Sequence, residues 1–448
     1  MKNTQFFKDI SRIYFIGIGG ISLSALSIIM KSNGFCVSGS DEVKSSITQK
    51  LESLGIKINY KHSKKNIESF RPDLIVYSGA VKESNSELSF ARKSNIKCLE
   101  RADFLGILTK LYDNVISISG THGKTTTTTM IAEIFEKAGY NPTIHIGGES
   151  VNLNSNVKVG SRDFFITEAC EYRKSFLKFK TDVSVVLNVE EDHPDCYKNY
   201  DEILSAFEEF VQNTKLCCFA LSDIKFKSKT KIINFNYKNA YFTCKNIIKT
   251  KKGYKFKVFK NETYVKTFEL NIFGKHNVLN ALAAICVADY FNIDYNIIKL
   301  ALKEFKGITR RFEKIESKNF NNPVFADYAH HPTEIKKLIE ETKSFNKSII
   351  CVFQPHTYSR TKKYFNDYLS CFNGSYQTIL YKTYKAREKL IKGADAKSLF
   401  KSLKKQGENA FYYNSFNKII KHLKKFVKPN CLILIVGAGD IYNLKSLI

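Results

Sequence analysis

Short apolar runs alternate with helix-length amphipathic stretches along most of this chain. The first hundred residues contain the apolar runs RIYFIGI, GFCVSGS, DLIVYSGA and IKCLE. Strands that alternate with helices build a parallel sheet covered by helices, so an α/β fold is expected. The pattern begins again near Tyr112 with DNVISISG, and near Arg310 it is followed by PVFADYA, SIICVFQ, QTILYKTY and CLILIVGAG. We therefore predict three α/β domains, at residues 1–108, 109–308 and 309–448.

One part of the central domain has a different pattern. Between Lys215 and Leu270, the short β-prone runs KIINFNY, NAYFTCK, YKFKVFK and TYVKTFEL are separated by Lys, Asn and Gly. This pattern is typical of antiparallel strands. We expect a small antiparallel sheet here, as an insert or at the edge of the parallel sheet.

The uncharged segment from Ile13 to Met30 is long enough to resemble a membrane span or a signal sequence. It contains three glycines and three serines, and a strand, a glycine turn and a helix explain it better. The eleven cysteines include no C-x-x-C pair, so neither a zinc site nor a disulfide framework is indicated. We expect a cytoplasmic protein with no membrane contact.

The net charge of +27 raises the alternative of an anionic partner such as nucleic acid. The excess is nearly all lysine scattered along the chain, and the one dense run is KHLKKFVK, from Lys421 to Lys428. A solvated, lysine-rich surface explains this distribution better than a nucleic-acid footprint. We expect no nucleic-acid partner.

The clearest candidate site is the stretch SISGTHGKTTTTT, from Ser117 to Thr129. It ends like the P-loop pattern G-x-x-x-x-G-K-[ST], but Ile118 stands where the first glycine of that pattern belongs. A tight glycine turn between a strand and a helix exposes backbone N–H groups and the positive end of the helix dipole to phosphate. We expect Lys124 to reach the terminal phosphates and the hydroxyl of Thr125 to bind magnesium.

Other polar residues follow predicted strands. The glycine cluster that begins at Gly17 lacks the third glycine of G-x-G-x-x-G, but Asp41 ends the next strand, where a ribose-binding acid is expected. This combination indicates a nucleotide diphosphate and does not distinguish a dinucleotide from a nucleotide sugar. Glu168 and His193 each follow an apolar run, so they are expected near the phosphate loop at the carboxyl ends of parallel strands.

Histidines and arginines gather in compact polar motifs. The grouped histidines are His122, His193, His276, His330, His331 and His356. Of only ten arginines, four lie in such motifs: Arg310, Arg311, Arg360 and Arg387. In a lysine-rich chain, arginine at these places indicates two-pronged recognition of phosphate or carboxylate.

The motifs GTHGKTTT, GKHNVLNALAA, GITRRFE, DYAHHPTEI, FQPHTYSRT and VGAGDI, in this order, resemble the Mur ligase family. The resemblance covers essentially the whole chain. It implies an N-terminal Rossmann-like domain for the UDP substrate, a central P-loop-type ATPase domain, and a C-terminal Rossmann-like domain that helps to bind the amino acid.

The resemblance also implies roles for particular residues. The ATP site would consist of Gly120, Thr121, His122, Gly123, Lys124, Thr125, Thr126, His276, Asn277, Arg311 and Asp327. Magnesium would be held by Thr125, Glu168 and His193. The UDP part would contact Gly17, Gly19, Gly20, Ser22, Ser40 and Asp41. The amino acid would contact Tyr328, His330, His356 and Arg360. The residues acting in catalysis would be Lys124, Glu168, His193 and Arg311.

The implied reaction is the joining of L-alanine to the muramyl carboxylate of UDP-N-acetylmuramate, with ATP and Mg²⁺, through an acyl phosphate. This is the first amino-acid addition in peptidoglycan precursor synthesis. Alternatives within the family are another amino acid or the recycling of a preformed peptide. Outside it, a nicotinamide-dependent oxidoreductase and a nucleic-acid-stimulated ATPase remain. A monomer or weak homodimer is expected.

Two segments depart from the family pattern. The family often reads E-A-D-E-S-D-x-S-F-L where this chain has EACEYRKSFL, from Glu168 to Leu177. The segment from Cys170 to Lys174 therefore leaves the contacts to the muramyl portion open. Many relatives read H-R-Y-[ST]-R where this chain has Thr357 after His356, so one arginine is absent from the amino-acid side.

Overall fold

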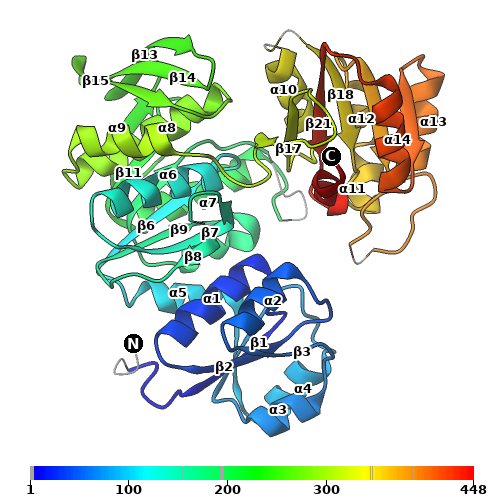
Figure 1. The fold of residues 1–448 in the computed structure, drawn as a ribbon. Coiled ribbons are helices and arrows are strands. Elements are labelled where there is room, and N and C mark those ends of the chain that lie inside the picture. The colour runs from blue at the N-terminus through cyan, green and yellow to red at the C-terminus, as the bar shows by residue number, and fades with distance from the viewer. Residues whose placement is uncertain (1–4, 154, 192–195, 344, 346, 387) are drawn as a thin grey trace. The chain divides into compact units, whose positions relative to one another are not determined.

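A computed structural model describes residues 5–153, 155–191, 196–343, 345, 347–386 and 388–448. The chain divides into two compact units, Met1–Ile308 and Thr309–Ile448. Each unit has its own sheets and its own buried core (Figure 1). The α/β fold expected from the sequence is confirmed in both units.

The first unit begins with a five-stranded parallel sheet in the order β3-β2-β1-β4-β5. Its strands are β1 (Arg12–Ile16), β2 (Cys36–Ser40), β3 (Lys57–Asn59), β4 (Leu74–Tyr77) and β5 (Lys97–Glu100). Its helices are α1 (Ile21–Ser32), α2 (Ser46–Ser53), α3 (Lys64–Phe70), α4 (Ser86–Lys93) and α5 (Arg101–Thr109). The expected strand, glycine turn and helix between Ile13 and Met30 are confirmed by β1 and α1. Among the described residues, no helix is long and apolar enough to cross a membrane.

The second sheet of this unit has ten strands in the order β15-β14-β13-β12-β11-β10-β6-β9-β7-β8. The strands are β6 (Asn114–Ser119), β7 (Thr143–Ser150), β8 (Ser155–Lys158), β9 (Phe164–Glu168), β10 (Thr181–Val186), β11 (Thr214–Leu221), β12 (Lys231–Asn236), β13 (Phe242–Lys249), β14 (Tyr254–Lys260) and β15 (Thr263–Leu270). The helices are α6 (Lys124–Lys137), α7 (Tyr200–Gln212), α8 (His276–Tyr290) and α9 (Tyr295–Glu304), with a 3-10 segment η1 (Tyr172–Lys178).

The expected antiparallel strands are confirmed for β13, β14 and β15, which lie at one edge of the main sheet. One detail differs from the expectation: strand β12 (KIINFN) pairs in parallel with β11 and connects the antiparallel strands to the main sheet. The physical reason is a shared core. Inward-facing residues of β14, such as Phe256 and Val258, pack in the same buried cluster as the apolar helix α8, which leaves no second core for a separate sheet.

The second unit contains a six-stranded sheet in the order β16-β17-β21-β18-β19-β20, in which β16 alone pairs antiparallel. The strands are β16 (Glu313–Ile315), β17 (Val324–Asp327), β18 (Ser348–Phe353), β19 (Gln377–Tyr381), β20 (Ala410–Tyr413) and β21 (Cys431–Val436). The helical segments are α10 (Pro332–Lys343), α11 (Tyr358–Lys363), α12 (Phe365–Ser370), α13 (Ala396–Lys405), α14 (Phe416–Phe426) and η2 (Asp440–Leu447). The sequence pattern indicated β17, β18, β19 and β21, whereas the short strands β16 and β20 went unpredicted.

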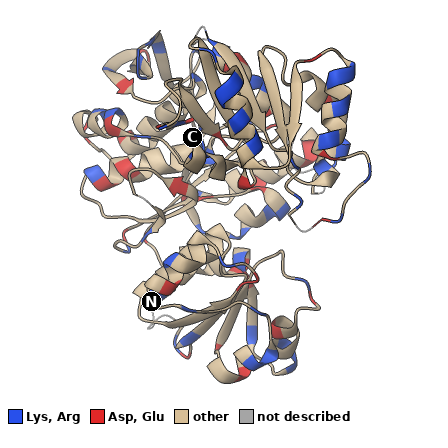
Figure 2. Cartoon of the chain, turned by 45° about the vertical axis from the view of Figure 1, so that its right-hand side comes forward, with Lys and Arg blue, Asp and Glu red and all other residues tan. Residues whose placement is uncertain are grey.

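Lysine and arginine residues are spread over the helices and loops of both units and are interspersed with acidic residues (Figure 2). The dense basic run from Lys421 to Lys428 lies largely on α14, which buries Ile419, His422 and Leu423. The lysines of this run are therefore the exposed side of an amphipathic helix.

Candidate functional site

The phosphate loop connects β6 to α6, as the sequence indicated. Its glycines Gly120 and Gly123 have φ values of +134° and +85°, which residues with a Cβ rarely adopt. Strand β6 lies between β9 and β10, and all three run in parallel. The carboxyl ends of these strands therefore surround the loop, at the place where open α/β sheets bind ligands.

A segment after β10 holds the phosphate loop from one side. The side chain of Asn188 accepts from the backbone N–H of His122 at 2.8 Å, and its amide donates to the His122 carbonyl at 3.0 Å. The hydroxyl of Thr121 accepts from the backbone N–H of Glu190 at 2.9 Å. Asn188 stands in VVLNVEE, the same run that precedes His193, but nothing in the sequence alone indicated its partner. His193 itself lies outside the described residues.

Lys124 turns toward a buried carboxylate. Its Nζ lies 3.0 and 3.2 Å from the two carboxylate oxygens of Glu171 and donates to the carbonyls of Gly120 and Thr121. The Glu171 side chain is completely buried. Burial opposes the charge of Lys124, but the carboxylate of Glu171 outweighs it and raises the pKa of Lys124. Sequence reasoning missed Glu171, which is the second glutamate of the EACEY segment.

Glu168 ends β9 opposite Ile118 of β6, which brings its carboxylate to the loop. Its Oε1 accepts from the backbone N–H of Gly147 at 2.6 Å. A Cβ on Gly147 would stand 2.8 Å from Glu168 Oε2, and a Cβ on Gly148 would stand 3.1 Å from the methyl carbon of Thr125. The two expected metal ligands Glu168 and Thr125 thus lie beside the adjacent glycines Gly147 and Gly148.

Helix α8 brings the expected adenine residues to the same loop. Asn277 is buried at the first turn of α8, next to His276, and its amide donates to the carbonyl of Phe273 at 2.7 Å. Asn280 donates to Asn277 Oδ1 at 2.9 Å. A Cβ on Gly123 would stand only 2.7 Å from Asn280 Oδ1. Asn280, which the sequence analysis did not select, therefore connects α8 to the phosphate loop.

The glycine turn after β1 forms as expected. Gly17 has a φ of +82°, and the backbone N–H of Gly19 donates to Asp41 Oδ2 at 2.9 Å. Gly20 is the N-cap of α1, with no side-chain cap. A Cβ on Gly19 would stand 2.8 Å from the same Asp41 oxygen, so a side chain there would break this contact. The glycine turn and the carboxylate of Asp41 are therefore in direct contact.

Two serines expected at the UDP site are engaged elsewhere. Ser40 is completely buried, and its hydroxyl donates to Glu87 at 2.5 Å in the interior of the domain. Ser22 makes a 2.9 Å hydrogen bond with Nε2 of His145, on β7. The hydroxyl of Ser40 therefore serves the domain interior.

In the second unit, Arg310 has a structural part that the sequence did not indicate. Its guanidinium donates to the carbonyls of Gly437 and Gly439, at 2.8 and 3.0 Å, and lies over the ring of Tyr328. It therefore ties the turn before β16 to the glycine turn after β21, whereas the sequence had grouped it with anion-binding arginines.

Arg311 and Asp327 lie close to the same tyrosine. The guanidinium of Arg311 is 5.3 Å from the centre of the Tyr328 ring. Asp327 accepts from the backbone N–H groups of Phe312 and Ala329, both at 2.7 Å. Burial raises the pKa of Asp327, against the lowering effect of the positive charge of Arg311. These contacts place both expected ATP residues of this unit beside Tyr328.

Three residues expected to bind the amino acid come together after β17 and β18: His330, His356 and Arg360. The rings of His330 and His356 are 5.6 Å apart, and His356 stacks on Tyr384 at 5.4 Å. Burial lowers the pKa of His330 to about 4; the carboxylate of Glu334 opposes this shift and the charge of Arg360 adds to it. Burial and then Arg360 also lower the pKa of His356. Both imidazoles are therefore neutral at pH 7, beside a guanidinium.

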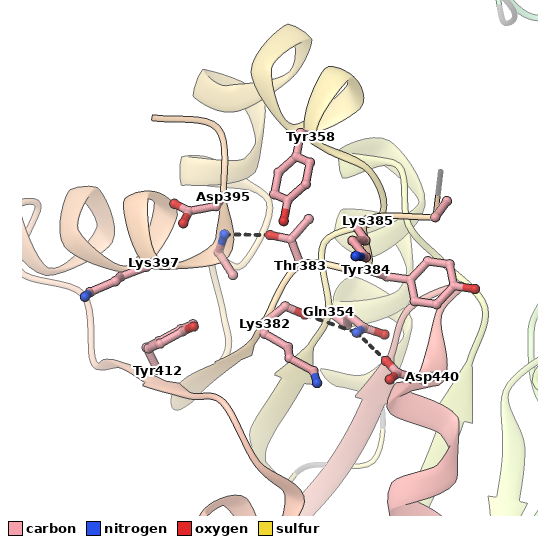
Figure 3. Close-up of a pocket in the computed structure, with 12 residues that line it drawn as sticks. Gln354, Tyr358, Lys382, Thr383, Tyr384, Lys385, Asp395, Lys397, Tyr412 and Asp440 are labelled. Atoms are coloured by element: carbon pink, nitrogen blue, oxygen red, sulfur yellow. Dashed lines mark hydrogen bonds between the residues drawn. The ribbon is translucent and has the colours of Figure 1, made fainter. Parts of the chain in front are cut away.

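A pocket of about 410 Å³ lies at the carboxyl ends of β18, β19 and β20 (Figure 3). Its labelled lining residues are Gln354, Tyr358, Lys382, Thr383, Tyr384, Lys385, Asp395, Lys397, Tyr412 and Asp440. Gln354 donates to Asp440 Oδ1 at 2.5 Å, and Thr383 accepts from the N–H of Ala396 at 2.8 Å. Because Tyr384 also stacks on His356, the pocket adjoins the expected amino-acid residues.

Three family models match successive parts of the chain. A model described as the Mur ligase family, catalytic domain, matches residues 12–113. The Mur ligase middle domain matches residues 118–288, and the Mur ligase glutamate ligase domain matches residues 310–439. A UDP-N-acetylmuramate--L-alanine ligase of Clostridium tetani is 43% identical over 99% of this chain and 99% of its own length. The chain belongs to the Mur ligase family.

Other relatives match this Mur ligase over nearly its whole length. A UDP-N-acetylmuramate--L-alanine ligase of Clostridium acetobutylicum is 41% identical, with 97% of each chain covered. The solved structure of a UDP-N-acetylmuramate-alanine ligase from Thermotoga maritima is 30% identical and superimposes with a TM-score of 0.84, again over 97% of each chain. A murein peptide ligase of Psychrobacter arcticus, at 22% identity and a TM-score of 0.71, shares the fold over 98% of each chain.

Proposed function

We propose that this Mur ligase joins L-alanine to the muramyl carboxylate of UDP-N-acetylmuramate at the expense of ATP, through an acyl phosphate. The observation that carries the proposal is the phosphate loop between β9 and β10, with Lys124 and Glu168 at its two sides. The names of relatives above 40% identity over nearly the full length support the same substrates. In peptidoglycan precursor synthesis this is the first amino-acid addition.

The loop binds the phosphates of ATP in this proposal. Backbone N–H groups from Gly120 to Thr126 face the phosphates, and Lys124 leaves Glu171 to contact the β and γ phosphates. The muramyl carboxylate then attacks the γ phosphorus. Lys124 offsets the negative charge that otherwise repels a carboxylate from a nucleotide, and the family resemblance assigns the same role to Arg311.

Thr125 and Glu168 suit Mg²⁺ because they are hard oxygen donors that lie along the Gly147–Gly148 pair. Magnesium would supply further neutralisation of the phosphate charge. Thr125 would hold it with its hydroxyl and Glu168 with its carboxylate, and His193, which lies outside the described residues, would be a further ligand. His276 and Asn277 would lie by the adenine.

The second unit binds the amino acid in this proposal. Arg360 pairs with the carboxylate of alanine, and Tyr328, His330 and His356 line the site. Nδ1 of His330 lies 3.1 Å from the carbonyl of Tyr328, an arrangement that keeps the proton on Nδ1. Nε2 of the neutral ring is then free of a proton and can accept a hydrogen bond from the ammonium group of alanine, which orients the amino acid.

The first domain holds the UDP part in this proposal. The glycine turn of Gly17, Gly19 and Gly20 offers backbone N–H groups to the diphosphate, and Asp41 closes the turn. Ser22 contributes through its backbone, since its hydroxyl bonds to His145. We further propose a cytoplasmic enzyme that acts as a monomer or a weak homodimer.

The test is a phosphate-release assay with purified protein in which each substrate is omitted in turn. The proposal requires that release needs ATP, magnesium, UDP-N-acetylmuramate and L-alanine together. Release that is independent of the muramyl nucleotide but raised by polynucleotide would favour a nucleic-acid-stimulated ATPase. Binding of a nicotinamide nucleotide at the Gly17 turn would favour an oxidoreductase.

A further inference from the structure

Arg360 lies on a short helix that does not cap itself. Helix α11 has six residues, Tyr358 to Lys363, and the side chain of its N-cap Thr357 accepts no hydrogen bond from a backbone N–H of the first turn. Thr357 also has a φ of +63°, in the left-handed region that non-glycine residues rarely adopt. A helix this short has little stability of its own, so its direction depends on outside contacts.

Glu388 supplies those contacts from a different loop. One carboxylate oxygen accepts from the backbone N–H groups of Tyr358 and Ser359, at 2.7 and 2.9 Å, and the other accepts from the Ser359 hydroxyl. Hydrogen bonds from these donors outweigh the effect of burial and lower the pKa of Glu388, so the group is ionised at pH 7. A carboxylate from 30 residues away thus takes the place of the missing N-cap.

The same loop fixes the strained residue before the helix. The backbone N–H of Thr357 donates to the carbonyl of Tyr384 at 2.8 Å, and that of Tyr384 donates to the carbonyl of Pro355 at 2.9 Å. The ring of Tyr384 stacks on His356. Tyr384 and Glu388 therefore hold both the start of α11 and the imidazole beside it.

Arg360 is free for a ligand in this arrangement. Among the described residues, its guanidinium makes no hydrogen bond or ion pair, yet its charge lowers the pKa of both His330 and His356 after the larger effect of burial. Within the described part of the chain, Arg360 is therefore an unpaired cation whose charge acts on the neutral imidazoles of His330 and His356. Its placement is set by the backbone of α11, and the backbone of α11 is held by Glu388.

We propose that Glu388 is a positioning residue of the amino-acid site, which sets the direction of Arg360 by capping α11. The proposal rests on the proposed function, since it takes Arg360 to bind the carboxylate of alanine. Glu388 does not touch the substrate. Its removal weakens alanine binding and leaves the ATP site in the first unit unaffected.

The test compares Glu388→Ala with Glu388→Gln by steady-state kinetics and thermal unfolding. Glu388→Ala is expected to raise the KM for alanine about tenfold, with the KM for ATP within about twofold of the parent, because a lost cap frees the helix start. Glu388→Gln keeps an acceptor for the Tyr358 and Ser359 N–H groups and is expected to restore most of the affinity. Glu408→Ala, at a glutamate of the same unit whose side chain makes no such contact, is the matched control.

An unchanged KM for alanine in folded Glu388→Ala would overturn the inference, as would an equal rise in the KM for ATP. Ser359→Ala removes one of the three donors and is expected to raise the KM for alanine about twofold. This variant keeps the test open if Glu388→Ala does not fold, and no change in it would also count against the inference. If Arg360→Ala itself leaves the KM for alanine unchanged, the assignment of the site fails, independently of Glu388.

Discussion

The phosphate loop and the turn that carries Arg360 are both short polar segments after a buried parallel strand, but they are held differently. The phosphate loop continues into the 14-residue helix α6 and is enclosed by the neighbouring strands β9 and β10. The Arg360 turn continues into the six-residue helix α11 and is held by the carboxylate of Glu388 and by the backbone hydrogen bond from Thr357 to Tyr384. The proposed nucleotide site is thus built into the sheet, whereas the proposed amino-acid site depends on contacts from a separate loop.

This difference suits the chemistry we propose. The proposed reaction needs the phosphates of ATP in one fixed place, and a loop fixed by a sheet provides that. The amino acid differs between ligases, and a binding residue on a short helix can be redirected by changing one loop. The comparison predicts large effects on turnover at the first site and effects confined to the amino acid at the second.

The largest expected effect is at Lys124. Lys124→Ala is expected to lower phosphate release by about a hundredfold or more, a few kcal/mol of transition-state stabilisation. It also leaves the buried Glu171 without its cation, so the midpoint of thermal unfolding falls. The double variant with Glu171→Gln is expected to recover stability but not activity. Lys137→Ala, at the end of the same helix, is the control, and near-normal turnover of Lys124→Ala would remove the phosphate-loop assignment.

Two glycines have the same backbone φ, so alanine variants of the two distinguish the effect of backbone strain on stability from the effect of a nearby contact on activity. Gly123 and Gly139 both have a φ of +85°, but a Cβ on Gly123 meets Asn280 at 2.7 Å while a Cβ on Gly139 meets nothing within 4 Å. Gly139→Ala is expected to lower the free energy of unfolding by about 1 kcal/mol with full activity. Gly123→Ala is expected to raise the KM for ATP at least about tenfold as well. Equal kinetics for the two variants would show that the Asn280 contact does not shape the loop.

At the second site we expect a selective effect. Arg360→Ala is expected to raise the KM for alanine about tenfold to a hundredfold, because a charge-assisted pair is lost, with little change in the KM for ATP. Lys362→Ala, an exposed cation on the same helix, controls for general charge. A change confined to the KM for ATP would place Arg360 at the nucleotide.

The smallest effect concerns the pH dependence of stability. His330 has a pKa near 4 in the folded chain, because burial disfavours its charge, and about 6.5 when unfolded. The unfolded chain therefore binds more protons between these values, and stability falls as the pH drops below 6.5. Between pH 8 and pH 5 this contributes roughly 1 to 2 kcal/mol. The free energy of unfolding of His330→Gln, measured in denaturant at pH 8 and pH 5, should fall by less than that of the parent, and the difference should equal this amount. An equal fall in both proteins would show that a group other than His330 takes up the proton.

The sequence predicts best what is encoded locally. The strand, the glycine turn and the lysine of the phosphate loop lie within a dozen residues, so their spacing alone indicates the site. Glu171 and Asn188 escaped notice because their partners are 47 and 66 residues away. Arg310 was misread for the same reason, since the carbonyls that it binds are more than a hundred residues downstream.

The sheet topology, too, was predicted where the local sequence encodes it and missed where distant residues decide it. Alternating runs predicted the three α/β regions, and the antiparallel pairing of β13, β14 and β15 was foreseen. The parallel pairing of β12 was not, because the residues of KIINFN are compatible with either direction. The choice is made by the core that these strands share with α8.

The most direct measurement of the central claim is phosphate release with this protein, ATP, magnesium and UDP-N-acetylmuramate while the third substrate alone is varied. The account predicts that L-alanine gives the highest kcat/KM and that a preformed peptide beginning with L-alanine gives little release. Preferred use of the peptide, or of another amino acid, with alanine inactive would contradict it.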